Sequence, residues 1–193
     1  MTARRRGRPP KSDDPATKDR LLDAAADACI ADGFESVTLA DIAERAGVTA
    51  TAIYNHFASR EELLYAAGRR ALDDLTDSLS PTLVGSDAVH EIALAYLRPD
   101  MAGTRRLFLE LHLAGAHHPD LAVHLAEWHR EFAKVIGDVA PDDGVPGATV
   151  KSLFMLLLGL CHLDDLDAIK ASPRAVRERV DLLVQALYPR DAA

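Results

Sequence analysis

Residues 38–64 read TLADIAERAGVTATAIYNHFASREELL, and this stretch decides the predicted fold. Thr38 is a good helix N-cap, and Asp41, three residues later, takes the place of the acidic residue in a capping box. Gly47 suits the left-handed backbone conformation that ends a helix. Thr49 can then cap a second short helix. Two short helices joined at a glycine predict a helix-turn-helix unit.

Helical periodicity continues on both sides of this unit. One helix is predicted from Thr17 to Asp32-Gly33, and a long one, capped by Ser59, from Arg60 to about Leu79. Further apolar stripes at helical spacing fall at 89–96, 101–113, 121–139, 150–163 and 176–187, and no segment alternates as a strand does. The sequence therefore predicts an all-α chain with a three-helix head and a larger helical body. The expected division is a disordered basic arm at 1–15, a helix-turn-helix domain at 16–60, and a ligand-binding and dimerisation domain at 61–190.

The distribution of charge separates these parts. The formal net charge is −8, which on its own argues against a nucleic-acid partner. Residues 1–11, however, hold five Lys/Arg and no acidic residue, whereas residues 61–193 hold thirteen Lys/Arg against twenty-one Asp/Glu. A basic arm attached to the head indicates an anionic partner for the N-terminal part of the chain.

The stretch from Thr17 to Leu64 resembles the DNA-binding domain of TetR-family transcriptional regulators. The shared pieces are Ala-x-x-Ala-Gly-Val-Thr, Tyr54-x-His56-Phe57 and Ser59-x-x-Glu62-Leu63-Leu64, at the family's spacing. The resemblance implies a sequence-specific regulator, expected to be a repressor released from a palindromic operator by a small molecule. The alternative is a DNA-binding regulator or architectural protein without an effector. The sequence does not tell a repressor from an activator. It also does not identify the operator, the regulated genes or the ligand.

The recognition helix of such a unit presents its first residues to base edges in the major groove. Ile53 and Phe57 must face the core, so the outward residues are expected to be Thr49, Ala50, Thr51 and Asn55. Asn55 can bond bidentately to adenine. The resemblance implies that Tyr54, His56 and Thr38 contact phosphates and that Arg60 adds a DNA contact.

Three positions depart from the family pattern, namely Thr51 for the usual Gly, Ala52 for Thr and Arg60 for Lys. Ala52 cannot donate to a phosphate, so one common contact is missing. Arg60 keeps the positive charge but carries it on a planar fork.

The arm RRRGRPPK resembles an AT-hook, whose Gly-Arg-Pro core lies in an A·T-rich minor groove. The other interpretation is a solvated basic tail that attracts DNA without reading it. Under both, Arg6 and Arg8 contribute to affinity.

In the body, the resemblance implies a small-molecule pocket for a largely apolar inducer, and plain packing is the competing interpretation. The candidate wall residues are Tyr96, Phe108, His112, Trp128, Phe132 and His162. Six of the eight histidines fall between His112 and His162, but their spacing matches no metal-binding signature, so no metal and no cofactor are expected.

A homodimer is expected, because a two-fold dimer reads an inverted repeat. The segment Leu153–Leu160 is too apolar to remain exposed, and the final helix offers a matching stripe. The predicted interface comprises Leu153, Leu156, Leu157, Leu160, Val176, Val180, Leu183 and Leu187.

An enzyme is the rival class. Neither a Gly-x-Ser-x-Gly elbow nor a Gly-Lys-Ser/Thr phosphate loop occurs, and His90-Glu91 lacks the second histidine of a zinc-protease helix. Cys29 and Cys161 are expected to be buried free thiols. With neither a signal peptide nor an apolar run of membrane-spanning length, a cytoplasmic protein is expected.

Overall fold

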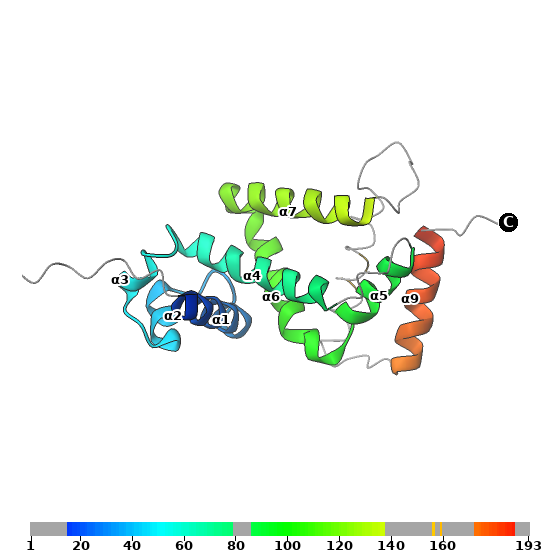
Figure 1. Ribbon diagram of the computed structural model, residues 1–193, viewed down its shortest axis with the longest axis horizontal. Coiled ribbons are helices and arrows are strands. Elements are labelled where there is room, and N and C mark those ends of the chain that lie inside the picture. Colours follow the sequence, from blue (N-terminus) through cyan, green and yellow to red (C-terminus); the bar gives the residue numbers. More distant parts are fainter. Residues whose placement is uncertain (1–14, 79–85, 138–155, 157–158, 160–171, 188–193) are drawn as a thin grey trace, which may run out of the picture. The chain divides into compact units, whose positions relative to one another are not determined.

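The computed structural model describes residues 15–78, 86–137, 156, 159 and 172–187. Every regular element in these residues is helical, as predicted (Figure 1). The elements are α1 (Pro15–Asp32), α2 (Leu39–Ala46), α3 (Ala50–Ile53), α4 (Arg60–Asp77), α5 (Ser86–Tyr96), the 3-10 helix η1 (Pro99–Met101), α6 (Ala102–Gly115), α7 (Pro119–Gly137) and α9 (Pro173–Leu187). None of the described helices is both long and apolar enough to cross a membrane.

The chain divides into two compact units, Met1–Ala67 and Gly68–Ala193, called here the head and the body. The division falls inside α4, whereas the sequence analysis placed the end of the head at residue 60. Leu63, Leu64 and Ala67 are almost completely buried. The head therefore includes the first two turns of α4, which supply apolar side chains that a head ending at residue 60 would lack.

In the head, α1 packs against α2, and α2 leads directly into α3 (Figure 1). The buried stripe of α1 includes Leu21, Leu22, Ala25 and Cys29. Phe34, just after α1, is also buried. The Cys29 side chain is fully buried, as predicted.

The predicted caps of the helix-turn-helix are confirmed. The Thr38 side chain accepts from the Asp41 N–H while Asp41 accepts from the Thr38 N–H, which makes a complete capping box. Gly47 ends α2 in the left-handed conformation, at φ 65°. The Thr49 side chain accepts from the Ala52 N–H at the start of α3. These local hydrogen bonds fix the turn between α2 and α3.

The sequence predicts that the second short helix runs through Phe57, and α3 is shorter than that. It ends at Ile53, and the residues up to Phe57 continue in tight turns. The Asn55 N–H donates to Ala52 O and the His56 N–H to Ile53 O, both three residues back. Tight i to i+3 turns are common where a helix ends. The change still buries both Ile53 and Phe57, so it leaves the predicted inward face intact.

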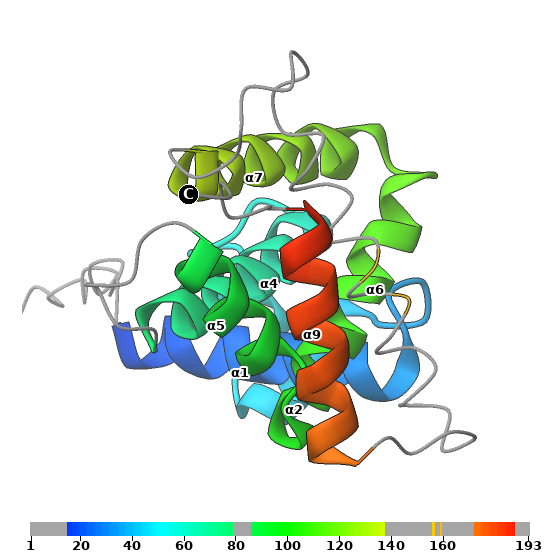
Figure 2. The ribbon, with the colours of Figure 1, turned by 90° about the vertical axis from the view of Figure 1, so that its right-hand side faces the viewer.

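In the body, α6 packs against α7 and α5 packs against α9 (Figures 1 and 2). Val89 and Tyr96 of α5 and Val180 and Val184 of α9 are buried. The His90 imidazole of α5 lies 2.5 Å from an Asp181 carboxylate oxygen of α9, which adds a polar link between these two helices. Gly68 of α4 lies so close to Leu111 of α6 that a Cβ there would stand 2.3 Å from the Leu111 Cδ1.

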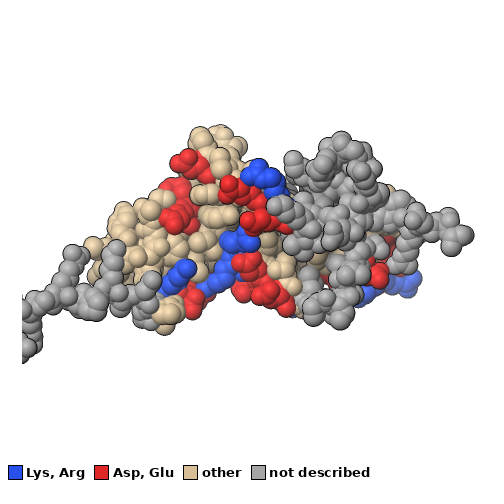
Figure 3. Space-filling view, turned by 45° about the horizontal axis from the view of Figure 1, so that its top comes forward, with Lys and Arg blue, Asp and Glu red and all other residues tan. Residues whose placement is uncertain are grey.

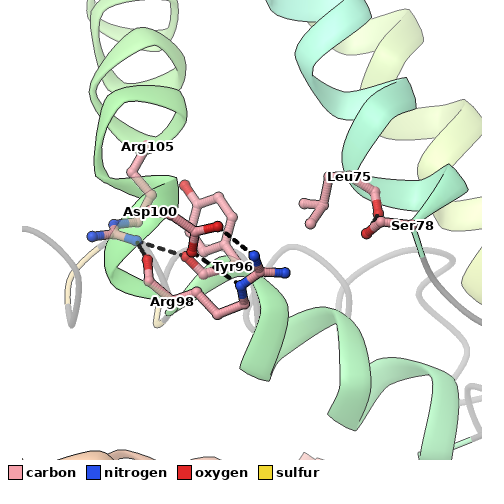
Figure 4. Close-up of polar contacts among 6 residues, drawn as sticks. All are labelled: Leu75, Ser78, Tyr96, Arg98, Asp100 and Arg105. Carbon is pink, nitrogen blue, oxygen red and sulfur yellow. Dashed lines mark hydrogen bonds and ion pairs between the residues drawn. The ribbon is translucent and has the colours of Figure 1, made fainter.

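A buried arginine joins α5 to α6. The guanidinium of Arg105, 6% exposed, donates from Nη1 to Tyr96 O and to Arg98 O, each at 2.8 Å (Figure 4). Arg98 in turn pairs with Asp100, and this hydrogen bond holds the pKa of the Asp100 carboxyl below its usual value. Arg105 therefore caps carbonyls at the end of α5, which explains how a charge is accommodated inside the body.

Candidate nucleic-acid interface and buried aromatic cluster

The segment from Thr49 to Phe57 has one exposed and one buried side. Tyr54 is 60% exposed, and Thr49, Ala50, Thr51 and Asn55 are also exposed. Ile53 is fully buried and Phe57 is 5% exposed. His56 is half-buried and lies 6.4 Å, centroid to centroid, from the Phe57 ring. The arrangement brings hydroxyl, amide, phenol and imidazole groups to one short exposed surface, which suits contacts to phosphates and base edges.

Thr38 lies at the start of α2 and is exposed, but its polar groups are occupied. Its hydroxyl donates to Asp41 Oδ2 at 2.6 Å and its N–H donates to the same oxygen at 2.9 Å. The hydroxyl bond, followed by the N–H bond, holds the pKa of the Asp41 carboxyl below its usual value. A phosphate approaching Thr38 meets a carboxylate already bound to that helix start.

The orientation of Arg60 differs from that of a residue that contacts DNA. Its side chain is 17% exposed and turns toward the interior of the head. Nη1 donates to Phe34 O and to Val37 O, the guanidinium carbon lies 4.6 Å from the Phe34 ring centroid, and Nε donates to Glu61 at 3.0 Å. The residue expected to contact DNA therefore makes several contacts within the head.

The other arginines of the described head also make internal contacts. Arg20 donates to Ala46 O at 3.3 Å, and Arg45 pairs with Asp32 at 2.6 Å. On the face drawn in Figure 3, basic side chains lie beside acidic ones. Residues 15–67 contain four Lys/Arg and nine Asp/Glu, a formal net charge of −5. The excess of basic residues in the N-terminal part is thus confined to the arm, where Arg6 and Arg8 lie outside the described residues.

In the body, four candidate wall residues come together as a cluster of rings. The rings of Tyr96 and Phe108 stack with centroids 6.2 Å apart, and Phe108 meets Trp128 edge-on at 5.0 Å. His112 lies 5.9 Å from Trp128. Tyr96, Phe108 and Trp128 are each at most 4% exposed. The side chain of Phe132 and the whole of His162 lie outside the described residues.

His129 joins this aromatic cluster, although the sequence analysis did not select it. Nδ1 of His112 lies 2.6 Å from Phe108 O, so it must carry the proton and donate. Nε2 of His112 then accepts from Nε2 of His129 at 2.9 Å. Burial lowers the pKa of His112, which agrees with a neutral ring. The signal in the sequence was the neighbouring pair Trp128-His129, but the pairing of His129 with His112 depends on how α6 meets α7.

Some of the predicted interface residues lie outside the described part of the chain, namely Leu153, Leu157 and Leu160. The side chain of Leu187 also lies outside it. Leu156 is 42% exposed, and Val176 and Leu183 are half-buried. Val180 is fully buried within the single chain, where α9 packs against α5, so in this packing it is not available to a second subunit. Among the described side chains of α9, Leu182 is a large apolar one that is exposed, at 67%. Among the described residues, no group of three or more His, Cys, Asp or Glu is placed to hold a metal ion.

Comparisons with known proteins point to one family. The family model for bacterial regulatory proteins of the tetR family matches residues 21–67. The regulator AlkX of Mycobacterium tuberculosis is 35% identical over 66 residues, which are 34% of this chain and 31% of that protein. The repressor KstR2 of Rhodococcus jostii is 38% identical over 71 residues, 35% of each chain. The chain thus matches about a third of the length of these two relatives.

Solved structures extend the similarity to the whole fold. The multidrug binding protein EbrR, crystallised with imidazole, superposes with a TM-score of 0.69 and covers 100% of both chains, at 23% sequence identity. At this level of identity the match supports the fold of the body. A shared fold does not by itself imply a shared ligand or activity.

Proposed function

We propose, from the membership of this chain in the TetR family of bacterial regulatory proteins, that it is a homodimeric repressor which binds an inverted-repeat operator and is released by a small molecule. Thr49, Ala50, Thr51 and Asn55 would read base edges, while Tyr54 and His56 would contact phosphates. Thr38 would join them by transferring its hydroxyl hydrogen bond from Asp41 to a phosphate. Transcriptional regulation through DNA binding is the general activity of the family. The operator, the dimer and the effector are the specific parts of the proposal.

The main structural support for the proposed DNA binding is that Tyr54 is exposed directly beside buried Ile53. A tyrosine that is 60% exposed loses most of its possible apolar burial and contributes little to the stability of the head. Its neighbours on the exposed side are polar. This composition suits contact with a phosphate backbone and with base edges.

The test is a gel-shift titration against a DNA duplex selected from a random pool by the unmodified protein. Tyr54→Ala combined with His56→Ala should abolish binding while helical circular dichroism stays unchanged. Val123→Ala, which removes an apolar side chain that is 56% exposed in the body, is the matched control and should bind normally. Unchanged affinity of the double variant would refute this assignment of the surface.

The arm is proposed to supply most of the electrostatic attraction, because residues 15–67 have a formal net charge of −5 and residues 1–11 contribute five positive charges. Deleting residues 2–11 should weaken binding and flatten its salt dependence by roughly 0.9 in log–log slope for each phosphate that the arm neutralises in the intact protein. If Arg6 and Arg8 read the minor groove, the loss of affinity should be larger on operators with A·T flanks than with G·C flanks. Equal losses would leave only the electrostatic role.

The aromatic cluster of Tyr96, Phe108, His112 and Trp128 is proposed as a wall of the effector site. EbrR, whose fold this chain shares, is a multidrug binding protein, and stacked rings are suited to flat apolar ligands. Trp128 is the single tryptophan of the sequence, so its fluorescence reports on this cluster alone. Small molecules extracted from the purified protein and identified by mass spectrometry should change that fluorescence and weaken DNA binding over the same concentration range. Release from DNA without any change in Trp128 emission would place the effector elsewhere.

The homodimer is proposed to form through α9 and the segment 153–160. Light scattering at micromolar concentration should give twice the mass of the chain. Leu183→Glu should disrupt the dimer, because an unpaired charge buried in an apolar interface costs several kcal/mol. A monomeric unmodified protein would refute the interface and the two-fold reading of DNA.

A further inference from the structure

Arg60 is the residue whose structural surroundings differ most from its expected role. The resemblance suggests a DNA contact at the start of α4. The structure instead shows a mostly buried side chain that contacts two backbone carbonyls, the Phe34 ring and Glu61. We infer that Arg60 is a positioning residue, an inference that rests on the proposed DNA-binding function. Arg60 holds the segment before α2, and with it Thr38, in place for DNA, and it does not itself bind phosphate.

The hydrogen-bond capacity of Arg60 is nearly used up within the head. A guanidinium carries five N–H groups. Nη1 donates to Phe34 O and to Val37 O, the latter at 3.0 Å. Nε donates to Glu61 at 3.0 Å, and Nη2 lies 2.9 Å from the same carboxylate oxygen. Four of the five N–H groups therefore have partners, so a bidentate phosphate contact would require breaking some of them.

The charge of Arg60 is also compensated locally. Burial raises the pKa of Glu61, but hydrogen bonds from its own backbone N–H and from Arg60, together with the Arg60 charge, outweigh burial and leave that pKa below its usual value. Glu61 is therefore ionised at neutral pH and neutralises the guanidinium. A phosphate at this place would be repelled by Glu61 as well as attracted by Arg60.

The two carbonyls that Arg60 binds lie at a critical place in the chain. Phe34 O and Val37 O belong to the turn between α1 and α2, and Val37 directly precedes Thr38, the N-cap of α2. The helix-turn-helix runs from Thr38 to Phe57, so the contact joins the segment before it to the helix after it. Stacking of the guanidinium on the buried Phe34 ring anchors the joint in the core of the head. Arg60 thus fixes where α2 begins relative to α4.

Lysine cannot replace this arrangement. Its ammonium is a point donor on a flexible stem, whereas the contacts here need a planar fork that stacks on a ring and bonds in two directions. A phosphate contact, in contrast, needs only a positive charge within reach, which lysine supplies. Arg60→Lys therefore separates the two roles, and Arg60→Gln removes the charge altogether.

The experiment compares Arg60→Lys, Arg60→Gln and the control Arg45→Gln, each verified as folded by circular dichroism well below its unfolding midpoint. Arg45→Gln removes the same charge from an exposed ion pair of the same head. The probe is the duplex selected by the unmodified protein, titrated at several salt concentrations. Both Arg60 variants should bind about tenfold more weakly, as for the removal of one hydrogen bond to a charged group, with an unchanged salt slope. Arg45→Gln should lose less affinity than either.

A second measurement needs no DNA. Hydrogen exchange of the Ile42 amide, which donates to Thr38 O in the first turn of α2, should accelerate in both Arg60 variants and not in Arg45→Gln. Three results would overturn the inference: a salt slope lower by about 0.9 in Arg60→Gln with normal binding by Arg60→Lys, unchanged affinity in both Arg60 variants, or unchanged exchange at Ile42. If the unmodified protein selects no duplex at all, the proposed function fails first, and the positioning role for DNA fails with it.

Discussion

The head and the body place their candidate functional residues in opposite environments. In the head, Tyr54 is 60% exposed and its polar neighbours lie on the surface. In the body, Tyr96, Phe108 and Trp128 are each at most 4% exposed and contact one another. The head thus presents groups to an outside partner, whereas the body gathers its candidates inside.

The difference shows how function and stability are divided within one chain. An exposed side chain can be devoted to a partner because it contributes little to folding. A buried aromatic residue contributes to folding whether or not it also contacts a ligand. Mutation of exposed Tyr54 should therefore separate binding from stability, whereas mutation of the buried rings of the body should leave the two coupled.

The largest expected effect compares Phe108→Ala with Tyr54→Ala. Removing the buried Phe108 ring should lower the free energy of unfolding by about 3–5 kcal/mol, because apolar burial is reduced and a cavity is left behind. Removing the exposed Tyr54 ring should change it by no more than about 0.5 kcal/mol. Urea denaturation followed by circular dichroism measures both. Similar losses in the free energy of unfolding for the two variants would contradict the contrast between the buried rings of the body and the exposed Tyr54 of the head.

The next comparison uses one glycine from each unit. Gly68→Ala should cost about 1–3 kcal/mol, because its Cβ would overlap the buried Leu111 side chain. Gly47→Ala should cost about 1–2 kcal/mol for a different reason, since φ is 65° there and nothing lies within 4 Å of an added Cβ.

Second variants distinguish these causes. Adding Leu111→Ala to Gly68→Ala should cost less than the sum of the single changes, because the overlap is removed. Gly47→Asn should be milder than Gly47→Ala, because asparagine tolerates the left-handed conformation. Strict additivity at Gly68, or equal losses of stability for the two Gly47 variants, would contradict the assigned causes.

A smaller effect is expected at the capping box. Thr38→Ala should lower the free energy of unfolding by about 1 kcal/mol, since the Asp41 N–H loses its acceptor at the start of α2. Thr38→Ser keeps the hydroxyl and is the control. Thermal unfolding compares the two, and a serine variant as unstable as the alanine variant would show that the methyl group, not the cap, matters.

The most gradual effect concerns pH and the body. Burial places the folded-state pKa of His112 below its unfolded value near 6.5, so the unfolded chain binds a proton more readily. Stability is therefore highest above that value and falls as the pH drops through it toward the folded pKa. The unfolding midpoint should decrease between pH 8 and 5.5, and His112→Gln should reduce that decrease. His117→Asn, an exposed change, should leave it unaltered. An equal pH dependence in both variants would exclude His112 as the cause.

Local chemistry explains which features of the head could be predicted. The caps at Thr38 and Thr49 and the stop at Gly47 depend on hydrogen bonds and backbone angles within a few residues, which the sequence displays directly. The inward side of α3 follows from Ile53 and Phe57. The sequence alone therefore determined the all-helical class, the helix-turn-helix and the side of it that is exposed.

Tertiary structure decided what depends on residues far apart in the chain. Arg60 binds carbonyls 23 and 26 residues away, His129 meets His112 only because α6 packs on α7, and Val180 is buried on α9, which packs against α5. The sequence indicates that a charged or apolar residue needs a partner. It does not indicate which of several possible residues is that partner. The choice belongs to the packing of whole helices, because only the folded chain brings those distant groups within hydrogen-bonding or van der Waals distance.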